Sequence, residues 1–440
     1  MNNDIEKNND IPKNNDIAKN YEITKTDELT KINKKKDMGL YIHIPFCVKK
    51  CDYCDFLSAP ATEEMKKKYF DAMQIEIESY TKAFEGYVIP TLFFGGGTPS
   101  SVDAIYISKI MEAIKKVFHL DLHRLEASIE VNPGTITKDK LIAYKEAGIN
   151  RLSFGLQSTN NKELSLLGRI HTYEQFAENY NLAREVGFEN INIDLMSALP
   201  GQTLESWENT LNTVVNLMPE HISAYSLIIE EGTQFFDRYQ ETSPNYKELP
   251  DEEEDRLIYH RTKEILELHG YRRYEISNYA KEGYECRHNS SYWIGTDYLG
   301  IGLGASSFLN GARFLNTQDL KQYIQVCDNI NNKKISQKIN LLNEDYSFSI
   351  DDTIELRKNF EQLSKEQKME EFMFLGLRMC DGISKQEFYE RFDIDINTVY
   401  GEVIQKLRMN NLLVLQGNKI RLTDYGVDIS NSVLSLFLLS

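Results

Sequence analysis

Short runs of apolar residues alternate with amphipathic stretches along most of this chain. Six of the apolar runs predict strands, at residues 39–44, 89–97, 126–134, 149–158, 190–201 and 221–229. Between them, apolar residues recur every three or four positions, which predicts helices at 64–84, 108–120, 139–148, 173–187 and 206–218. Continuous apolar strands that alternate with helices are typical of parallel βα units. Six units in succession favour an α/β fold built as a partial (β/α)6 barrel of TIM type over a short doubly wound sheet.

The pattern changes on either side of the barrel, which is predicted over residues 38–270. Residues 1–37 are rich in Asn and Lys and repeat NNDIEK, NNDIPK and NNDIAK, so we expect a disordered leader with too little apolar surface to fold. An extension of the barrel is expected at 271–327, and it contains a glycine-rich strand and turn at 298–308. The polar stretch 328–362 is expected to be a flexible linker or insertion.

A compact C-terminal domain is predicted over residues 363–440. Three amphipathic helices are followed by a hairpin around Gly417-Asn418, and Ser384 with Glu387 has the sequence of a helix capping box. Three helices and a hairpin suggest a winged-helix-like fold. Because this segment carries more Asp and Glu than Lys and Arg, a DNA-binding role is not expected.

Composition and net charge narrow the functional classes. With 440 residues and 41% hydrophobic side chains the chain can bury a sizeable core, but its net charge of −17 argues against nucleic acid as the main partner. The sequence has no run of about 18 apolar residues, so it predicts no membrane span. The N-terminal residues lack the apolar core of a secretory signal. We therefore expect a cytoplasmic protein, in which thiols stay reduced.

Three of the six cysteines stand close together after the first predicted strand, as Cys47, Cys51 and Cys54 in a C-x3-C-x2-C motif. In a reducing compartment such a group indicates metal or redox chemistry more often than disulfides. A structural zinc site takes four protein ligands, and a cubane iron–sulfur cluster normally takes four cysteines. Three thiolates would leave one iron open to a small bidentate ligand, whereas a nearby histidine could complete a zinc site. Both interpretations stay open at this point.

Other polar and glycine residues fall at the carboxyl ends of the predicted strands, where barrels assemble their chemistry. The run GGGTP at 95–99 ends the second strand, Glu130 ends the third, Gln157 ends the fourth and Asp194 lies in the fifth. Buried carboxylates are rare without a partner, so Asp194 favours a functional role. Arg169 could instead form a surface ion pair of little consequence. The agreement of these positions predicts one site.

These motifs resemble the radical S-adenosylmethionine (SAM) superfamily, and within it the oxygen-independent coproporphyrinogen III oxidases and the related HemW-type heme chaperones. The runs YIHIPFC, FFGGGTPS, EVNPG, RLSFGLQS, LGRIHT and DLMSALPGQ carry the resemblance. It implies a [4Fe-4S] cluster on the three cysteines, with SAM chelating the open iron. It further implies SAM contacts from Tyr41, Tyr53, Gly96, Gly97, Thr98, Glu130, Gln157, Arg169 and Asp194, the last three belonging in part to a second SAM in the oxidases.

Two positions separate the oxidases from the chaperones. The oxidases extend the motif by one more cysteine, where this chain has Phe56. Far downstream, the motif H-N-x-x-Y-W resembles a signature of the HemW group that is associated with heme, and it implies heme-binding candidates at His288, Asn289, Tyr292 and Trp293. Histidine is a standard axial ligand of heme iron, and Tyr and Trp offer flat apolar faces. The alternative is that His288 caps a loop and Trp293 fills the core.

The resemblance therefore predicts a protein that binds heme and transfers it to apo-proteins. It implies an electron donor such as flavodoxin and a heme donor of the bacterioferritin kind as partners. The alternative is a radical enzyme that acts on a tetrapyrrole, by oxidative decarboxylation or by methyl transfer linked to heme opening, and a zinc protein without catalysis is the third hypothesis. Residues 363–440 resemble the C-terminal domain of the oxidase-like family, which would cover the barrel mouth. Peripheral membrane attachment, a tendency of the family, has no visible helix in this sequence.

Overall fold

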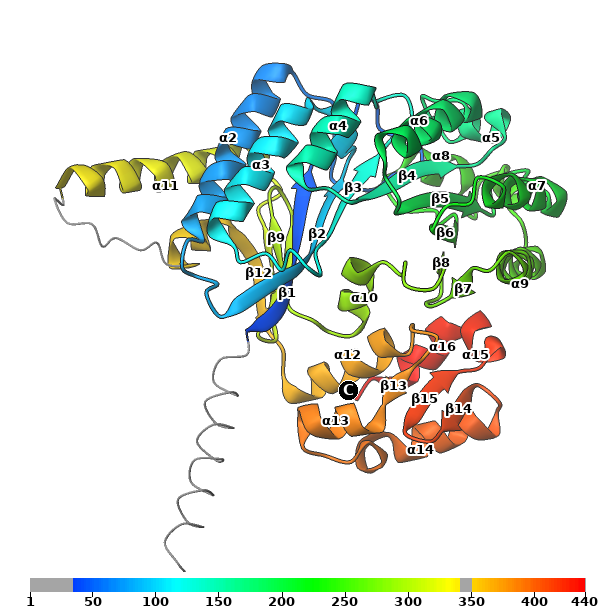
Figure 1. The fold of residues 1–440 in the computed structure, drawn as a ribbon. Coiled ribbons are helices and arrows are strands. Elements are labelled where there is room, and N and C mark those ends of the chain that lie inside the picture. The colour runs from blue at the N-terminus through cyan, green and yellow to red at the C-terminus, as the bar shows by residue number, and fades with distance from the viewer. Residues whose placement is uncertain (1–34, 341–349, 440) are drawn as a thin grey trace, which may run out of the picture.

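One twelve-stranded sheet organises the larger part of the molecule (Figure 1). The computed structural model describes residues 35–340 and 350–439, so the predicted leader lies outside the described residues up to position 34. The strand order is β12-β11-β10-β9-β1-β2-β3-β4-β5-β6-β8-β7. Strands adjacent in the middle of this order are also consecutive in the chain, which is the arrangement that βα units produce.

Six parallel strands form the middle of the sheet, as the sequence predicted. They are β1 (Lys36–Ile44), β2 (Tyr87–Gly96), β3 (Glu126–Val131), β4 (Arg151–Gln157), β5 (Ile191–Ser197) and β6 (His221–Ser226). In β1 the side chains of Leu40, Ile42 and Ile44 are fully buried, whereas Tyr41 and His43 alternate with them and point to the opposite face. One face of the sheet is thus a continuous apolar core, and the other carries polar groups into the barrel interior.

Helices that follow the strands cover the outer, apolar face (Figure 1). They are α2 (Glu63–Ser79), α3 (Ala104–Val117), α4 (Lys138–Ala147), α6 (Tyr173–Val186) and α7 (Leu204–Val215), and α9 (Glu252–Leu268) packs beside α7. The glycines predicted to end two of these helices do so, because Gly148 and Gly187 adopt left-handed φ angles of 101° and 93°. Ends of other helices differ from the sequence-based bounds by a few residues.

The sheet is longer than a six-stranded barrel because short strands are added at both edges. On the β1 side lie β9 (Tyr298–Ile301), which is parallel to β1, and the antiparallel β10 (Ser306–Leu309) and β11 (Ala312–Asn316). On the β6 side lie β8 (Asn278–Ala280) and β7 (Arg272–Arg273). The buried carboxylate of Glu76 in α2 ties the β9 side to the barrel, since it accepts hydrogen bonds from the Gly302 amide, Asn316 Nδ2, and the Tyr80 and Tyr323 hydroxyls.

The stretch 328–362, which we expected to be a flexible linker or insertion, contains regular helix and strand in the part that the structure describes. Helix α11 (Leu320–Asn340) runs well into it, and the 3₁₀ helix Ile350–Leu356 and strand β12 (Arg357–Gln362) follow, while 341–349 lie outside the described residues. The start of α11 packs on α2 through buried residues such as Tyr323 and Ile330. Strand β12 is an almost fully exposed edge strand, so no hydrophobic alternation marked it in the sequence.

The C-terminal domain contains the three predicted helices and the predicted hairpin around a separate core. The helices are α12 (Lys365–Gly376), α13 (Lys385–Phe392) and α14 (Ile396–Met409), and the hairpin is β14 (Leu413–Gln416) with β15 (Lys419–Leu422), joined by β13 (Ile383–Ser384). Only half of the predicted capping box is present: Ser384 accepts from the Glu387 amide, and the Glu387 carboxylate pairs with Arg391 instead. In Figure 1 this domain lies against the short helix α10 (Arg287–Trp293).

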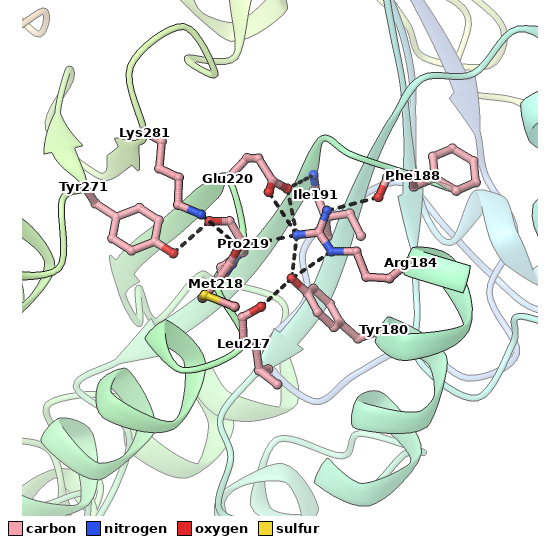
Figure 2. A network of polar contacts seen from close by, with 10 residues as sticks. All are labelled: Tyr180, Arg184, Phe188, Ile191, Leu217, Met218, Pro219, Glu220, Tyr271 and Lys281. Carbon is pink, nitrogen blue, oxygen red and sulfur yellow. Dashed lines mark hydrogen bonds and ion pairs between the residues drawn. The ribbon is translucent and has the colours of Figure 1, made fainter. Parts of the chain in front are cut away.

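Figure 2 shows a polar network at the amino ends of β5 and β6, opposite the edge where chemistry is expected. Arg184 of α6 donates to the Tyr180 hydroxyl at 2.6 Å and to both carboxylate oxygens of Glu220, at 2.8 and 3.1 Å. Glu220 also accepts from the Ile191 amide at 3.1 Å, and the Tyr271 hydroxyl donates to the Pro219 carbonyl beside it. The network therefore fixes helix α6 to the starts of two neighbouring strands.

We expect Glu220→Gln to lower the free energy of unfolding by about 1–3 kcal/mol, because a half-buried charged hydrogen-bond network loses its acceptor charge. Denaturant-induced unfolding measured by circular dichroism checks this. The matched control is Asp71→Asn, which removes an exposed ion pair to Lys67 and should leave the midpoint unchanged. Equal midpoints for both variants would contradict the structural role given to Glu220.

Candidate functional site

A cavity of about 340 Å³ opens at the carboxyl ends of the parallel strands. It brings together most of the residues that the motifs predicted to act in one place. Of the predicted cluster and SAM residues, its lining includes Cys47, Cys51, Cys54, Tyr53, Gly96, Gly97, Thr98, Glu130, Gln157, Arg169 and Asp194. Phe56 also lines it and is 61% exposed, so it lies at the mouth. The cavity sits where TIM-type barrels place their chemistry.

The cysteine loop is held against the strand ends by backbone hydrogen bonds. The Cys47 amide donates to the Ala59 carbonyl, and the Asp52 amide donates to the Leu167 carbonyl. The Thr98 hydroxyl lies 3.5 Å from the sulfur of Cys47. Burial raises the pKa of the Cys54 thiol to about 11, so this sulfur is protonated when nothing is bound. A metal that binds it must displace that proton.

The cysteine loop packs closely against Gly97, the residue that follows strand β2. A methyl group on Gly97 would lie 2.8 Å from the Phe46 carbonyl oxygen and 2.9 Å from the Cys47 sulfur. The Gly97 amide donates to the Ile44 carbonyl, and the Thr98 amide donates to the Phe46 carbonyl. Only glycine allows the two backbones to pack this closely. Close packing of the cysteine loop therefore explains why glycine stands at position 97, which the sequence alone did not reveal.

Two carboxyl groups lie in the cavity. Burial, together with the negative charge of Asp194, raises the pKa of Glu130 to about 8, although the Gly96 amide donates a hydrogen bond to it at 3.1 Å. Burial also raises the pKa of Asp194, against hydrogen bonds from Asn192 at 2.7 Å and Ser153 at 3.2 Å. Two buried carboxyl groups in one cavity favour a cationic ligand, because a cation lets both ionise.

Arg169 is part of the cavity wall, and it forms no ion pair with any described residue. Its guanidinium donates to the Asn132 side-chain oxygen at 2.9 Å and to the Gly155 carbonyl, and it lies 3.5 Å from the sulfur of Cys51. The alternative of a surface ion pair is therefore excluded. On the same wall, Gln157 accepts from the Tyr225 hydroxyl at 2.9 Å. Tyr225, on the sixth strand, is a cavity residue that the motifs did not indicate.

Tyr41 lies apart from this group, in the wall of a second cleft of about 450 Å³. Its hydroxyl is 3.1 Å from Nδ1 of His43, and Nε2 of His43 is 3.0 Å from the Leu57 carbonyl. Burial raises the pKa of Tyr41, and the charge of Glu130 adds to the effect, so the ring stands close behind the first cavity. His43 also lines this cleft, and the only sequence signal for its place is the alternation of strand β1.

The H-N-x-x-Y-W motif forms helix α10, which separates the two cavities. Asn289 lines the first cavity, whereas Tyr292 and Trp293 line the second cleft. His288 is only 1% exposed, with Nδ1 3.1 Å from the Thr91 hydroxyl and Nε2 2.8 Å from the Tyr292 hydroxyl. Both of its nitrogens are thus engaged, and in this arrangement His288 positions Tyr292. The motif residues do not converge on one point.

The comparisons with known proteins agree with this architecture. The Radical SAM superfamily profile matches residues 41–214, and the HemN C-terminal domain profile matches 363–429. The chain is 35% identical to heme chaperone HemW of Bacillus subtilis, over 90% of this chain and 98% of that protein. It is 34% identical to heme chaperone HemW of Lactococcus lactis, over 92% and 98% of the two chains.

A solved structure shows the same fold. Coproporphyrinogen III oxidase (HemN) from Escherichia coli superposes with a TM-score of 0.73 at 24% identity, and the match covers 92% of this chain and 91% of that one. No helix in the described parts of the chain is both long enough and apolar enough to cross a membrane.

We expect Gly97→Ala to displace Cys47, because the added methyl group has no room beside its sulfur. Iron retained after anaerobic reconstitution, measured per chain, should fall to a small fraction of the wild-type value. Gly86→Ala is the control, since no atom lies within 4 Å of its added methyl group. Wild-type iron content in Gly97→Ala would show that the loop tolerates the larger residue.

The raised pKa of Glu130 predicts a pH dependence of stability. A carboxyl whose pKa is higher folded than unfolded binds an extra proton when folded, so its contribution is greatest at low pH and is lost as pH rises to about 8. In cluster-free protein, Glu130→Gln should therefore match the wild type near pH 4.5 and become progressively more stable than it up to pH 8. Chemical unfolding at several pH values measures this difference, and a difference independent of pH would refute the assignment.

Proposed function

This chain belongs to the HemW heme chaperone family of radical SAM proteins, and we propose that it carries a [4Fe-4S] cluster, binds SAM and takes up heme for transfer to apo-proteins. The observation that carries the proposal is the place of helix α10. This one short helix presents Asn289 to the cavity of the three cysteines and Tyr292 and Trp293 to an aromatic cleft. A cofactor site and an apolar ligand site therefore share a wall.

The residues of the first cavity fit a cluster better than a single ion. Among the described residues, no three Cys, His, Asp or Glu side chains converge as one metal ion requires. Three thiols that line one cavity suit a cubane, in which each sulfur would take a different iron. Such a cluster would supply one electron and an open iron for the amino and carboxylate groups of SAM. This arrangement supports the cluster over the zinc hypothesis.

SAM fits the remaining chemistry of the same cavity. It carries a sulfonium and an amino group, and Glu130 and Asp194 supply the negative charge that such a cation needs. Gly96 and Gly97 both line this cavity, so their backbone lies beside the space that we give to SAM. We assign the methionine end of SAM to this run and the cationic centre to the two carboxyl groups. We assign the nucleoside end of SAM to the remaining residues, Tyr53, Gln157 and Arg169.

Phe56 favours a heme carrier over a porphyrinogen oxidase. The oxidases resembled by this sequence have a cysteine at that position, and here an exposed aromatic ring stands at the cavity mouth. We assign heme to the aromatic side of α10, where Tyr292 and Trp293 offer ring faces to a porphyrin. An electron donor such as flavodoxin, a heme donor and cytoplasmic apo-proteins are the partners that this function requires.

Anaerobic reconstitution tests the function directly. We expect wild-type protein to bind iron and sulfide, to show a Soret band on titration with heme, and to leave coproporphyrinogen III unchanged in the presence of SAM and reductant. A Cys47→Ala, Cys51→Ala, Cys54→Ala variant should lose the cluster. Turnover of coproporphyrinogen to protoporphyrinogen would establish the oxidase alternative. Stoichiometric zinc with no cluster would exclude both the chaperone and the radical-enzyme hypotheses.

Trp293→Ala is expected to weaken heme binding about tenfold or more, since it removes one aromatic face of the proposed site. Titration followed at the Soret band measures the dissociation constant. The control is Tyr389→Ala, which removes a ring that is 51% exposed on the C-terminal domain. His288→Ala should instead lower the unfolding midpoint, because two buried hydrogen bonds are lost. Equal affinities in wild type and Trp293→Ala would exclude this face as the heme site.

A further inference from the structure

The second cleft has a lining that suits a flat apolar molecule. Six rings line its volume of about 450 Å³, those of Tyr41, His43, Tyr292, Trp293, Tyr298 and Phe308. A neighbouring cavity of about 250 Å³ shares Trp293, Gly295, Phe308, Glu371 and Leu375 with it, so the two spaces adjoin. Together they reach from the edge of the sheet to helix α12. Pockets of this size and composition are typical of sites for small organic ligands and cofactors.

Arg313 is the cation of the cleft. It lies on β11, where its guanidinium stands 5.6 Å from the centre of the Phe308 ring and pairs with Glu371 at 2.9 Å. The side chain is 43% exposed, yet its Nε is buried and has no partner among residues 35–340 and 350–439. Because the side chain is partly exposed, a ligand carboxylate can reach its guanidinium, which can bind a carboxylate with two parallel hydrogen bonds.

Glu371, on α12, lies in an environment that disfavours the ionised form of its carboxyl group. Burial raises the pKa of Glu371, and the charges of Glu361 and Glu370 raise it further, while Arg313 opposes the shift. The ion pair with Arg313 joins the sheet to the C-terminal domain. A ligand carboxylate that competes for Arg313 therefore competes with Glu371, whose charge is disfavoured by the like charges around it.

We propose that Arg313 anchors a propionate carboxylate of a tetrapyrrole held between the aromatic rings of this cleft, and that the propionate displaces Glu371. The inference rests on the proposed heme-carrying function and adds its anchor. An aromatic cleft with one cation selects a flat apolar body that carries a peripheral anion, which describes heme. Loading then breaks an ion pair between the sheet and α12, so a loaded molecule differs from an empty one in how α12 is held.

Heme and its dimethyl ester provide the test, because the ester keeps the ring and iron but has no carboxylates. Full-length protein is titrated with each compound, as wild type, Arg313→Ala and Glu371→Gln. We expect Arg313→Ala to weaken heme binding about ten- to hundredfold, the range of a charge-assisted hydrogen bond. The ester should bind wild type and Arg313→Ala equally. Glu371→Gln should bind heme more tightly than wild type, since the competitor has lost its charge.

Arg272→Ala is the matched control, because Arg272 forms an exposed ion pair with Asp381 of the C-terminal domain and lines neither cavity. It should bind heme as wild type does. Hydrogen exchange of α12 gives a second measurement: heme should speed exchange of its amides, and the ester should not. This comparison uses wild type alone, so it remains decisive if Arg313→Ala fails to fold.

The outcomes separate this inference from the function on which it rests. If wild type binds neither heme nor the ester, the proposed function itself fails. Two results with a wild type that binds heme would refute the anchor and leave the heme-carrying function standing. One is that Arg313→Ala weakens binding of heme and of the ester equally. The other is that Glu371→Gln leaves heme affinity unchanged. Discrimination between heme and ester that disappears in Arg313→Ala establishes the anchor.

Discussion

The close approach between the cysteine loop and the end of β2 is the constraint on which the rest of the site depends. Gly97 leaves less than 3 Å between the position of its missing methyl group and both the Phe46 carbonyl and the Cys47 sulfur. Parallel strands bring their carboxyl ends to one edge, but they do not by themselves bring a loop down onto that edge. The loop reaches it because β2 ends without side chains. The thiols then lie over the same cavity as Glu130 and Asp194.

That proximity sets the electrostatics of the cavity. The thiols and carboxyl groups all become anions when they ionise, and burial opposes ionisation of Cys54, Glu130 and Asp194 alike. Arg169 is a cation among them, and it is already bonded to Asn132 and the Gly155 carbonyl. Lys49 and Lys50 also line the cavity. Three thiolates and two carboxylates would outnumber these three cations, so the lining does not neutralise itself when all of its acidic groups are ionised. Iron and a sulfonium ligand would supply the missing positive charge, which is a physical reason for the two to bind together.

The sequence predicted the barrel and the first cavity well because both depend on local patterns. Strand alternation, helix-ending glycines such as Gly148 and the spacing of Cys47, Cys51 and Cys54 are all readable within a few residues. Strand β12 was missed because it is exposed and polar, and its pairing with β11 is a contact between distant segments. The spacing of residues in the H-N-x-x-Y-W motif did not predict which cavity each of its side chains would face. Which face of α10 each side chain takes depends on Thr91 of β2 and on α12.

The two ends of α10 are held by different parts of the molecule. At its start, the buried carboxylate of Glu126 accepts from the amides of Arg287 and His288, at 3.0 and 2.9 Å, which fixes this end to β3. At its other end, Arg378 of the C-terminal domain lies 4.5 Å from the Trp293 ring centre, and Arg391 donates to the Ile294 carbonyl. A shift of the C-terminal domain must therefore move the Trp293 end of the helix more than the Asn289 end. Because Asn289 faces the cysteine cavity and Trp293 faces the aromatic cleft, such a shift would reshape the cleft while leaving the cysteine cavity nearly unchanged.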